Sequence, residues 1–338
     1  MTAIDAAAVE ADMASRLQER INTFTATLAF HDTPPEPPQR WLIDRVIEHR
    51  TLAWIAGQPN GGKSFIAVDM ACRIATGKPW DGNAVEQCRV LYVAAERFRS
   101  VRRRIAAWQQ HHNTIASDLI VMRCDSKSRP NLSKGRDLDA LIAVANAHDV
   151  RLIIIDTFAK VIVGLDENSN QDMSALVGNL ETLKDQTNAT VLVIHHKTKS
   201  NAPGLRGAGG LQGDADTVID VRRERKPPKH IIIDDDKQAD AEKVSGRRFR
   251  LISVNESAVI EPAAAPAGLP QPLIDAFEEH SDTITTGIAA AALGVSVNTA
   301  KTRLTKYEQQ GHINHTGTGK ASRWQRIRYN LDDDDEGI

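Results

Sequence analysis

Short apolar runs rich in β-branched residues alternate with longer stretches of helical spacing through the middle of the chain. These runs are Leu52–Ala56, Val90–Ala94, Leu119–Met122, Leu152–Ile155, Thr190–Ile194 and Thr217–Val221. Such alternation is typical of parallel βαβ units. Because the run at 152–155 is apolar without interruption, it predicts a strand that helices cover on both faces. The pattern therefore predicts an α/β fold with a mostly parallel central sheet.

Two more apolar runs follow this region, and breaker-rich stretches separate it from the rest of the chain. His230–Ile233 and Phe249–Val254 flank a charged turn, which predicts an antiparallel hairpin at the sheet edge. Helical spacing ahead of the proline-rich run 34–38 predicts an N-terminal helix on a stiff tether. We therefore divide the chain into a helix and tether (1–38), an α/β domain (39–256), an Ala/Pro-rich linker (257–271), a small module (272–330) and an acidic tail (331–338).

The small module combines three stretches of helical spacing with a hairpin pattern. Helices are predicted to begin near Pro272, Thr286 and Val297. Two short runs, 312–315 and 322–327, bracket a glycine-rich turn, as the wing of a winged helix-turn-helix would. The module is therefore predicted to be a small α+β winged helix.

Length and cysteine content narrow the classes of protein. A chain of 338 residues is long enough for about two domains. Cys72, Cys88 and Cys124 show no CxxC spacing, so the sequence indicates neither a disulfide framework nor a zinc site. No apolar run approaches the ~20 residues of a membrane span, and no signal-like start is present. We therefore expect a cytoplasmic protein with no membrane partner.

The net charge of -2 conceals a local asymmetry. Between Ser296 and Asn330, seven Lys or Arg residues face the single acid Glu308. This balance favours contact between the winged module and DNA, with binding of a protein as the alternative. The side chains expected to face a DNA groove are Asn298, Thr299, Lys301 and Arg303, and those expected to hold phosphates are Lys320 and Arg323.

Residues Gly57–Ser64 match the pattern GxxxxGK[ST], directly after an apolar run and before a stretch of helical spacing. Triphosphate oxygens need closely wrapped backbone N–H groups, which glycine-rich loops and helix N-termini supply. We therefore predict a site for ATP and Mg²⁺, in which Lys63 reaches the β- and γ-phosphates and Ser64 ligands the metal. The residues predicted to bind nucleotide here are Gly57, Gln58, Pro59, Asn60, Gly61, Gly62, Lys63, Ser64 and Phe65.

Two acidic residues end predicted strands. Asp156 follows the buried run 152–155, where an acid holds the Mg²⁺ hydration shell in P-loop NTPases, so it is the Walker B candidate and binds the metal through water. The next residue is Thr157, so the carboxylate that polarises the attacking water must come from elsewhere. Glu96, which follows the run at 90–94, is our candidate for that role. A solvated strand-end carboxylate is the alternative.

A third predicted strand ends in the pair His195 and His196. One of them is predicted to hydrogen-bond the γ-phosphate and report its loss. A structural histidine is the alternative, and metal ligation is disfavoured because no further His or Cys lies nearby at ligand spacing. Most of the arginines after Glu96 are expected on a solvated helix face, with one facing the nucleotide or a neighbouring subunit. They are Arg97, Arg99, Arg102, Arg103 and Arg104.

In combination these motifs resemble the RepA-type hexameric helicases of plasmids and phages, within the RecA-like ATPases. The resemblance rests on residues 57–64, 92–96, 153–157, 194–197 and 206–210, and it covers about residues 40–255. It implies a RecA-like P-loop NTPase fold. It also implies a homo-oligomeric, usually hexameric ring that hydrolyses ATP between subunits and moves along single-stranded DNA.

The resemblance further implies an arginine finger, a cation that reaches the γ-phosphate of the neighbouring subunit. Arg206 is the favoured candidate, and a DNA contact in the central channel is its alternative role. The predicted catalytic residues are thus Glu96, Lys63, Asp156 and Arg206. The competing finger candidates are Lys237, Arg247 and Arg248. The loops 164–171 and 197–210 are candidate DNA contacts.

Three functions are compatible with this sequence. The first is an ATP-dependent DNA helicase or translocase of plasmid or phage replication, with single-stranded DNA, duplex DNA and replication proteins as partners. The second is a RecA-like recombination or DNA-loading ATPase that forms filaments. The third is a DNA-binding regulator in which ATP serves as an assembly switch. A small-molecule kinase is disfavoured because it would not need the second module.

Overall fold

The structure is a computed structural model that describes residues 6–28, 39–125, 127–166, 169–197, 215–224, 229–238, 245–263, 269–309, 312–317, 319 and 322–327. The chain divides into two compact units, Met1–Gln39 and Arg40–Ile338. Within these described ranges, no helix has the length and apolar character needed to cross a membrane.

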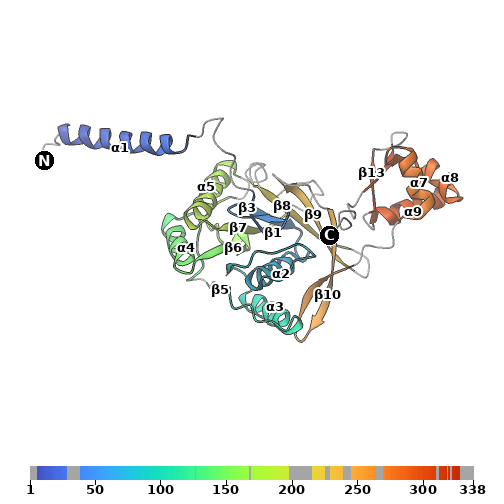
Figure 1. Ribbon diagram of the computed structural model, residues 1–338, viewed down its shortest axis with the longest axis horizontal. Helices are drawn as coiled ribbons and strands as arrows, with labels where there is room; N and C mark the ends of the chain where they lie inside the picture. Colours follow the sequence, from blue (N-terminus) through green and yellow to red (C-terminus); the bar gives the residue numbers. More distant parts are fainter. Residues whose placement is uncertain are drawn as a thin grey trace, which may run out of the picture. The chain divides into compact units, whose positions relative to one another are not determined.

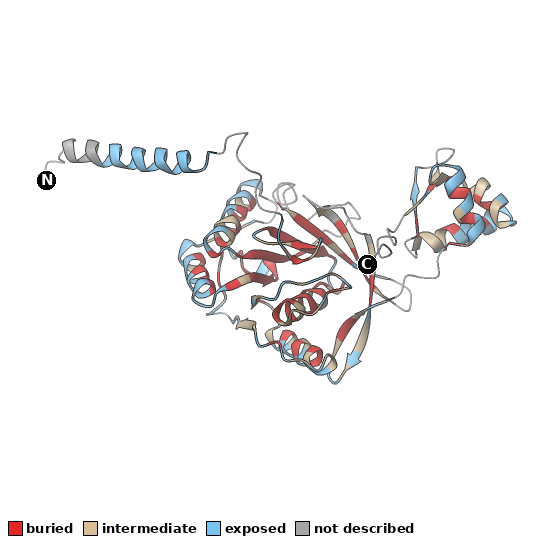
Figure 2. Ribbon diagram, viewed as in Figure 1, coloured by how far each residue is buried: buried red, intermediate tan, exposed pale blue. Residues whose placement is uncertain are grey.

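The first unit holds one helix, α1 (Ala6–Ala26), where the spacing predicts it. Its large apolar side chains recur every three or four residues and therefore form a stripe along one side. Figure 2 shows the described part of this helix as exposed. The exposed fractions are 66% for Met13, 62% for Leu17, 44% for Ile21, 55% for Phe24 and 68% for Leu28 just beyond the helix. The stripe is thus not buried within its own unit.

The second unit is built around a nine-stranded sheet with the strand order β11-β10-β9-β8-β3-β7-β6-β4-β5 (Figure 1). Its parallel strands are β3 (Leu52–Gly57), β4 (Arg89–Ala94), β5 (Leu119–Arg123), β6 (Val150–Asp156), β7 (Thr190–His196) and β8 (Thr217–Arg223). The antiparallel strands are β9 (Ile231–Gln238), β10 (Ser245–Val254) and β11 (Ser257–Pro262). A ribbon of β1 (Trp41–Ile43) and β2 (Ile47–Glu48) precedes β3.

Helices cover both faces of this sheet. The helices α2 (Lys63–Thr76) and α3 (Phe98–His111) contribute to one apolar core. The helices α4 (Gly135–Ala147) and α5 (Asn170–Thr187), with the short 3-10 helix η1 (Phe158–Lys160), contribute to the other. Because neighbouring side chains of a strand point to opposite faces, Ile154 enters the first core and Ile155 the second. This explains why the run at 152–155 is apolar at every position.

The strand order brings the ends of the chemistry-bearing strands together. β3 leads into the phosphate loop and lies between β7 and β8, while β4 lies beside β6. The carboxyl ends of these parallel strands meet at one edge of the sheet, where α/β proteins bind ligands. This mostly parallel sheet fits a RecA-like P-loop NTPase core, which confirms the predicted fold class.

The antiparallel end of the sheet differs from the prediction in one respect. β9 and β10 pair as the expected hairpin, but β11 pairs with β10 beyond it. Val259 and Ile260 on β11 are buried in the core that α2 and α3 share. The linker predicted over 257–271 therefore begins too early, because residues 257–262 belong to the sheet. Their apolar centre is too short to stand out between polar neighbours in the sequence.

The small C-terminal module contains three helices and a three-stranded antiparallel sheet in the order β12-β14-β13. Its elements are α7 (Gln271–Glu279), β12 (Thr283–Ile284), α8 (Thr286–Leu293), α9 (Val297–Gln309), β13 (Ile313–Thr316) and β14 (Arg323–Arg326). Thr285 caps α8 by accepting from Ile288 N at 3.2 Å, and Gly294 ends that helix at φ 61°. Leu273, Phe277, Leu304 and Trp324 fill a separate core. The predicted helices and hairpin are all present.

Candidate functional site

The phosphate loop lies between β3 and α2 and rests against two strands from much later in the chain. Gly57 has φ 154°, and a Cβ there would lie 2.0 Å from the carbonyl oxygen of Val221 on β8. Gly62 has φ 110°, and its Cβ would lie 2.6 Å from Cδ1 of Ile231 on β9. Only glycine combines these backbone angles with so close an approach. The glycines of the motif therefore fix the loop against β8 and β9.

Lys63, at the start of α2, is folded back into this loop. Its Nζ donates to the carbonyl oxygens of Gly57 at 2.8 Å and Gln58 at 2.9 Å, and it lies 3.2 Å from Nδ1 of His196. The residue is only 5% exposed. Burial lowers the pKa of Lys63 to about 8, against the opposing effect of Asp156 and Asp220. The loop thus holds a cation that anionic phosphate oxygens would stabilise.

This pKa predicts a pH dependence of nucleotide binding. Above pH 8 the free site contains mostly neutral Lys63, whereas bound phosphates favour the ammonium form, so binding must take up a proton. We expect the affinity for ADP to fall about tenfold between roughly pH 8 and pH 9.5, as one proton of linkage requires. Titration of a fluorescent ADP would measure it. Lys63→Arg, whose guanidinium stays charged, should give a flat profile; an equal fall in that variant would contradict the assignment.

Asp156 ends β6 inside the same site and is 4% exposed. Its Oδ2 accepts a hydrogen bond from the Tyr92 hydroxyl at 2.7 Å, and the Ser64 hydroxyl also donates to this carboxylate. Burial raises the pKa of Asp156, while these two hydrogen bonds oppose the shift. The structure thus brings the two predicted metal-binding residues, Ser64 and Asp156, into contact. It also adds Tyr92, a fully buried phenol that sequence reasoning missed.

Glu96 follows β4, the neighbour of β6 in the sheet. Ala94 is the register partner of Asp156, and Glu96 N donates to the Asp156 carbonyl at 3.1 Å. The Glu96 side chain is 35% exposed and forms an ion pair with Arg97, with Nε and Oε1 3.4 Å apart. The predicted base and the predicted Walker B acid therefore lie side by side.

The histidine pair is divided between the two faces of β7. His196 reaches Lys63, as described above, and lines the pocket around the phosphate loop. His195 is 1% exposed in the core, edge-on to Trp54 at 5.8 Å and to Phe158 at 5.1 Å between ring centroids. Strand alternation separates the two rings. Of the pair predicted to bind nucleotide, the structure brings only His196 to the site.

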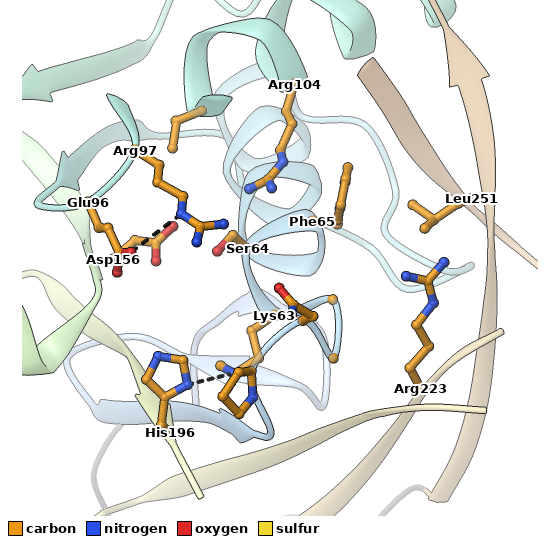
Figure 3. A pocket seen from close by; sticks show the side chains of 15 residues that line it. Lys63, Ser64, Phe65, Glu96, Arg97, Arg104, Asp156, His196, Arg223 and Leu251 are labelled. Carbon is orange, nitrogen blue, oxygen red and sulfur yellow. Dashed lines mark hydrogen bonds and ion pairs between the residues drawn. The ribbon is translucent and has the colours of Figure 1, made fainter. Parts of the chain in front are cut away.

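A pocket of about 420 Å³ opens above the phosphate loop (Figure 3), within the range of small-molecule sites. Many of the residues that line it were predicted from the sequence as site residues. They are Pro59, Asn60, Gly61, Gly62, Lys63, Ser64, Phe65, Glu96, Asp156 and His196. Sequence reasoning did not single out Val101, Arg223 or Leu251, which complete the wall with Arg97 and Arg104. Arg104 lies over the Phe65 ring at 4.2 Å, and burial lowers its pKa. Two of the clustered arginines, Arg97 and Arg104, thus face the site.

The arginine-finger candidates have separate outcomes. Arg206 and the loop at 198–210 lie outside the described residues. Arg247 forms an ion pair with Asp81 at 3.2 Å, and Arg248 forms one with Glu224. Both arginines are largely buried in these pairs, with side chains 11% and 4% exposed, so neither fits a finger that reaches another subunit. Lys237 lies on β9 opposite Val218.

The residues of the pocket fit a nucleoside triphosphate with Mg²⁺. The glycines leave no room for a Cβ on the strand side of the loop, so backbone rather than side chain forms the cradle. Ser64 and Asp156 supply the hydroxyl and carboxylate oxygens that Mg²⁺ prefers. The Thr157 hydroxyl beside them is buried without a hydrogen-bond partner in the described part of the chain. Such an orphaned atom is typical of a site that a ligand or water completes.

The chain is similar to a known protein family and to a solved structure. The sequence pattern of a protein family described as "AAA domain" matches residues 17–202, more than half of the chain. Among solved structures, the chain is similar to the KaiC-like protein PH0186 from the hyperthermophilic archaeon Pyrococcus horikoshii OT3. The two share 17% sequence identity over 65% of this chain and 94% of the archaeal one, with a TM-score of 0.45.

Proposed function

This chain belongs to the AAA domain family, and within that family we propose that it is an ATP-dependent DNA helicase or translocase of plasmid or phage replication type. At the coarser level it is a P-loop ATPase of the RecA-like superfamily. The observation that carries the proposal is the placement of Glu96 just after β4, beside Asp156 at the end of β6, above the phosphate loop. Carboxylates at the ends of adjacent strands separate RecA-like ATPases, to which the RepA-type helicases belong, from other P-loop groups.

In this proposal each pocket residue has a defined task. Lys63 holds the β- and γ-phosphates, while Ser64 and Asp156 hold Mg²⁺, which neutralises charge on the phosphate oxygens when bound. Glu96 orients the attacking water, and His196, in contact with Lys63, responds to the γ-phosphate. Arg206 of a neighbouring copy supplies the finger, which makes hydrolysis depend on a homo-oligomeric ring, hexameric as in the RepA-type family.

The C-terminal module supports a DNA partner. As a winged helix, it would present α9 to duplex DNA. Asn298, Thr299, Lys301 and Arg303 are all exposed on that helix, and a hydrogen bond joins the hydroxyl groups of Ser296 and Thr299 at 2.9 Å. Exposed cations and hydroxyl groups on one helix suit phosphate and base contacts. The module would locate DNA while the ring moves on a single strand.

The deciding experiment is unwinding of a labelled forked duplex, together with ATPase rates with and without single-stranded DNA. We expect ATP-dependent strand separation and DNA-stimulated hydrolysis, both lost in Lys63→Ala. The matched control is Lys134→Ala, which removes an exposed lysine at the start of α4. Stimulated hydrolysis without strand separation would instead support a filament-forming recombination or loading ATPase. Sequence-specific duplex binding with neither activity would support the regulator.

The exposed stripe of α1 predicts how copies of the chain associate. Single apolar side chains on a surface are ordinary, but a continuous stripe on a helix requires a partner surface. We expect the stripe to dock on an adjacent copy, so that deletion of residues 1–35 lowers the oligomer mass measured by light scattering. Leu17→Glu with Phe24→Glu should do the same, because both side chains are more than half exposed. An unchanged mass in both variants would show that α1 has another use.

A further inference from the structure

A second hollow, of about 350 Å³, opens beside the nucleotide pocket where β5 ends and α3 begins. Its lining residues are Arg97, Phe98, Arg99, Arg123, Cys124 and Asp125. Arg99 and Arg123 are exposed, and neither forms an ion pair with another residue that the structure describes. Three arginines therefore line a hollow that contains one carboxylate.

That carboxylate belongs to Asp125, which accepts hydrogen bonds from residues of its own turn. Asp125 Oδ1 accepts from Lys127 N at 2.9 Å, from Ser128 N at 3.0 Å and from the Ser128 hydroxyl at 3.0 Å. These bonds all end on one oxygen, and Arg123 also acts on this carboxylate, because it helps to lower the pKa of Asp125 after the larger effect of these hydrogen bonds. A single carboxylate is still outnumbered by the three arginines of the hollow. The positive character of the site extends along α3, where Arg102 and Arg103 are also exposed. Residues 99, 102 and 103 share one helix face, which gives a row of cations about 6 Å long from residue 99 to 103.

Arg97 connects the two hollows. It lines both the nucleotide pocket and the arginine hollow, and its guanidinium pairs with the predicted base Glu96 at 3.4 Å. Its side chain is 69% exposed, so it can move between partners. A carboxylate oxygen that is held by a guanidinium group is turned toward that group and not toward a water molecule next to the γ-phosphate. The ion pair thus restrains the residue assigned to activate water.

We propose that the arginine hollow binds phosphate groups of a nucleic acid backbone, and that this binding draws Arg97 away from Glu96 and so raises the rate of ATP hydrolysis. Guanidinium groups bind phosphates through paired hydrogen bonds, and a row of them suits a chain of evenly spaced phosphates. The inference rests on the proposed function, since it assumes that Glu96 is the base. It adds a DNA contact outside the loops 164–171 and 197–210.

The double variant Arg99→Ala, Arg123→Ala tests the site. We expect hydrolysis without DNA to stay within about twofold of the wild type, since neither side chain lines the nucleotide pocket. Stimulation by oligo-dT should be lost. The dependence of log affinity on log salt, measured by fluorescence anisotropy, should flatten by about 1.4, for two contacts at ~0.7 each on single strands. The matched control is Lys134→Ala, Arg136→Ala, which removes two exposed cations on the other face of the sheet.

Arg97→Ala tests the coupling. It should raise the rate of ATP hydrolysis without DNA toward the DNA-stimulated rate of the wild type, because the ion pair that restrains Glu96 is then absent. If the wild type is stimulated by DNA but the double variant is stimulated equally, the site is wrong while the proposed function stands. If the wild type neither binds DNA nor responds to it, both are wrong. Equal stimulation by polyaspartate would assign the hollow to an acidic protein segment and overturn the nucleic acid assignment.

Discussion

Glu96→Gln is expected to lower kcat for ATP hydrolysis by about 10²–10⁴, the range for loss of a positioned general base. The amide keeps the size of the side chain but cannot accept the proton of the attacking water. Glu96 lies at the end of β4 beside Asp156, and its side chain is half-buried at the pocket wall. The substitution therefore removes a chemical group without opening a cavity, so the folded state should persist.

The measurement is single-turnover hydrolysis alongside equilibrium binding of ADP. Binding should stay within about threefold, because Glu96 faces water rather than the diphosphate in our assignment. Glu256→Gln is the matched control, since Glu256 is exposed in the turn between β10 and β11. A kcat close to that of the wild type would remove Glu96 from the chemistry and would leave the base to be found on another strand or another copy.

Lys63→Ala is expected to lower hydrolysis by about 10²–10³, the cost of removing one preorganised stabiliser of charge in a transition state. Unlike Glu96→Gln, it should also weaken nucleotide binding, because the ammonium holds the β- and γ-phosphates in the ground state as well. The same Nζ holds the carbonyl groups of Gly57 and Gln58 in the free protein. Its loss thus frees two loop carbonyls whose lone pairs repel phosphate oxygens.

Separate control measurements distinguish a disturbed loop from a missing charge. Lys63→Arg retains a cation but not its shape, so it should recover part of the affinity and little of the rate. Thermal unfolding of Lys63→Ala should match that of Lys134→Ala to within a few degrees, since the lost contacts involve one side chain. Full hydrolysis by Lys63→Ala would contradict the assignment of the phosphate loop.

The elements that the sequence predicts well are those in which a local sequence pattern has a single structural cause. The apolar runs from Leu52 to Val221 became β3 to β8, and the signal is strongest in β3, β6 and β7, where burial on both faces makes nearly every position apolar. The phosphate loop is predictable because its glycines are required by the local backbone conformation, so the motif can be read from consecutive residues. Strand order then brings Glu96 and Asp156 together, as expected of the fold.

The residues that sequence reasoning missed depend on contacts between distant parts of the chain. Tyr92 lies within an apolar run, and only the structure shows that its hydroxyl meets Asp156. A buried phenol needs a hydrogen-bond partner. A tyrosine in an apolar run therefore indicates that such a partner exists, but the sequence does not identify it. Arg223 and Leu251 enter the pocket from β8 and β10, strands that no local motif links to the phosphate loop. The division of His195 from His196 follows from strand alternation and was open to prediction.

The contact between Gly57 and Val221 has a consequence for how the sequence can vary. The partner of Gly57 is a backbone carbonyl, so the contact is the same whichever side chain stands at position 221. The apolar character of Val221 is required by the core, where it is fully buried, and not by the loop. Position 57 is therefore fixed while position 221 drifts among apolar residues, and the two should show no statistical covariation among homologues. Contact maps inferred from covariation would therefore miss this close approach between the phosphate loop and β8.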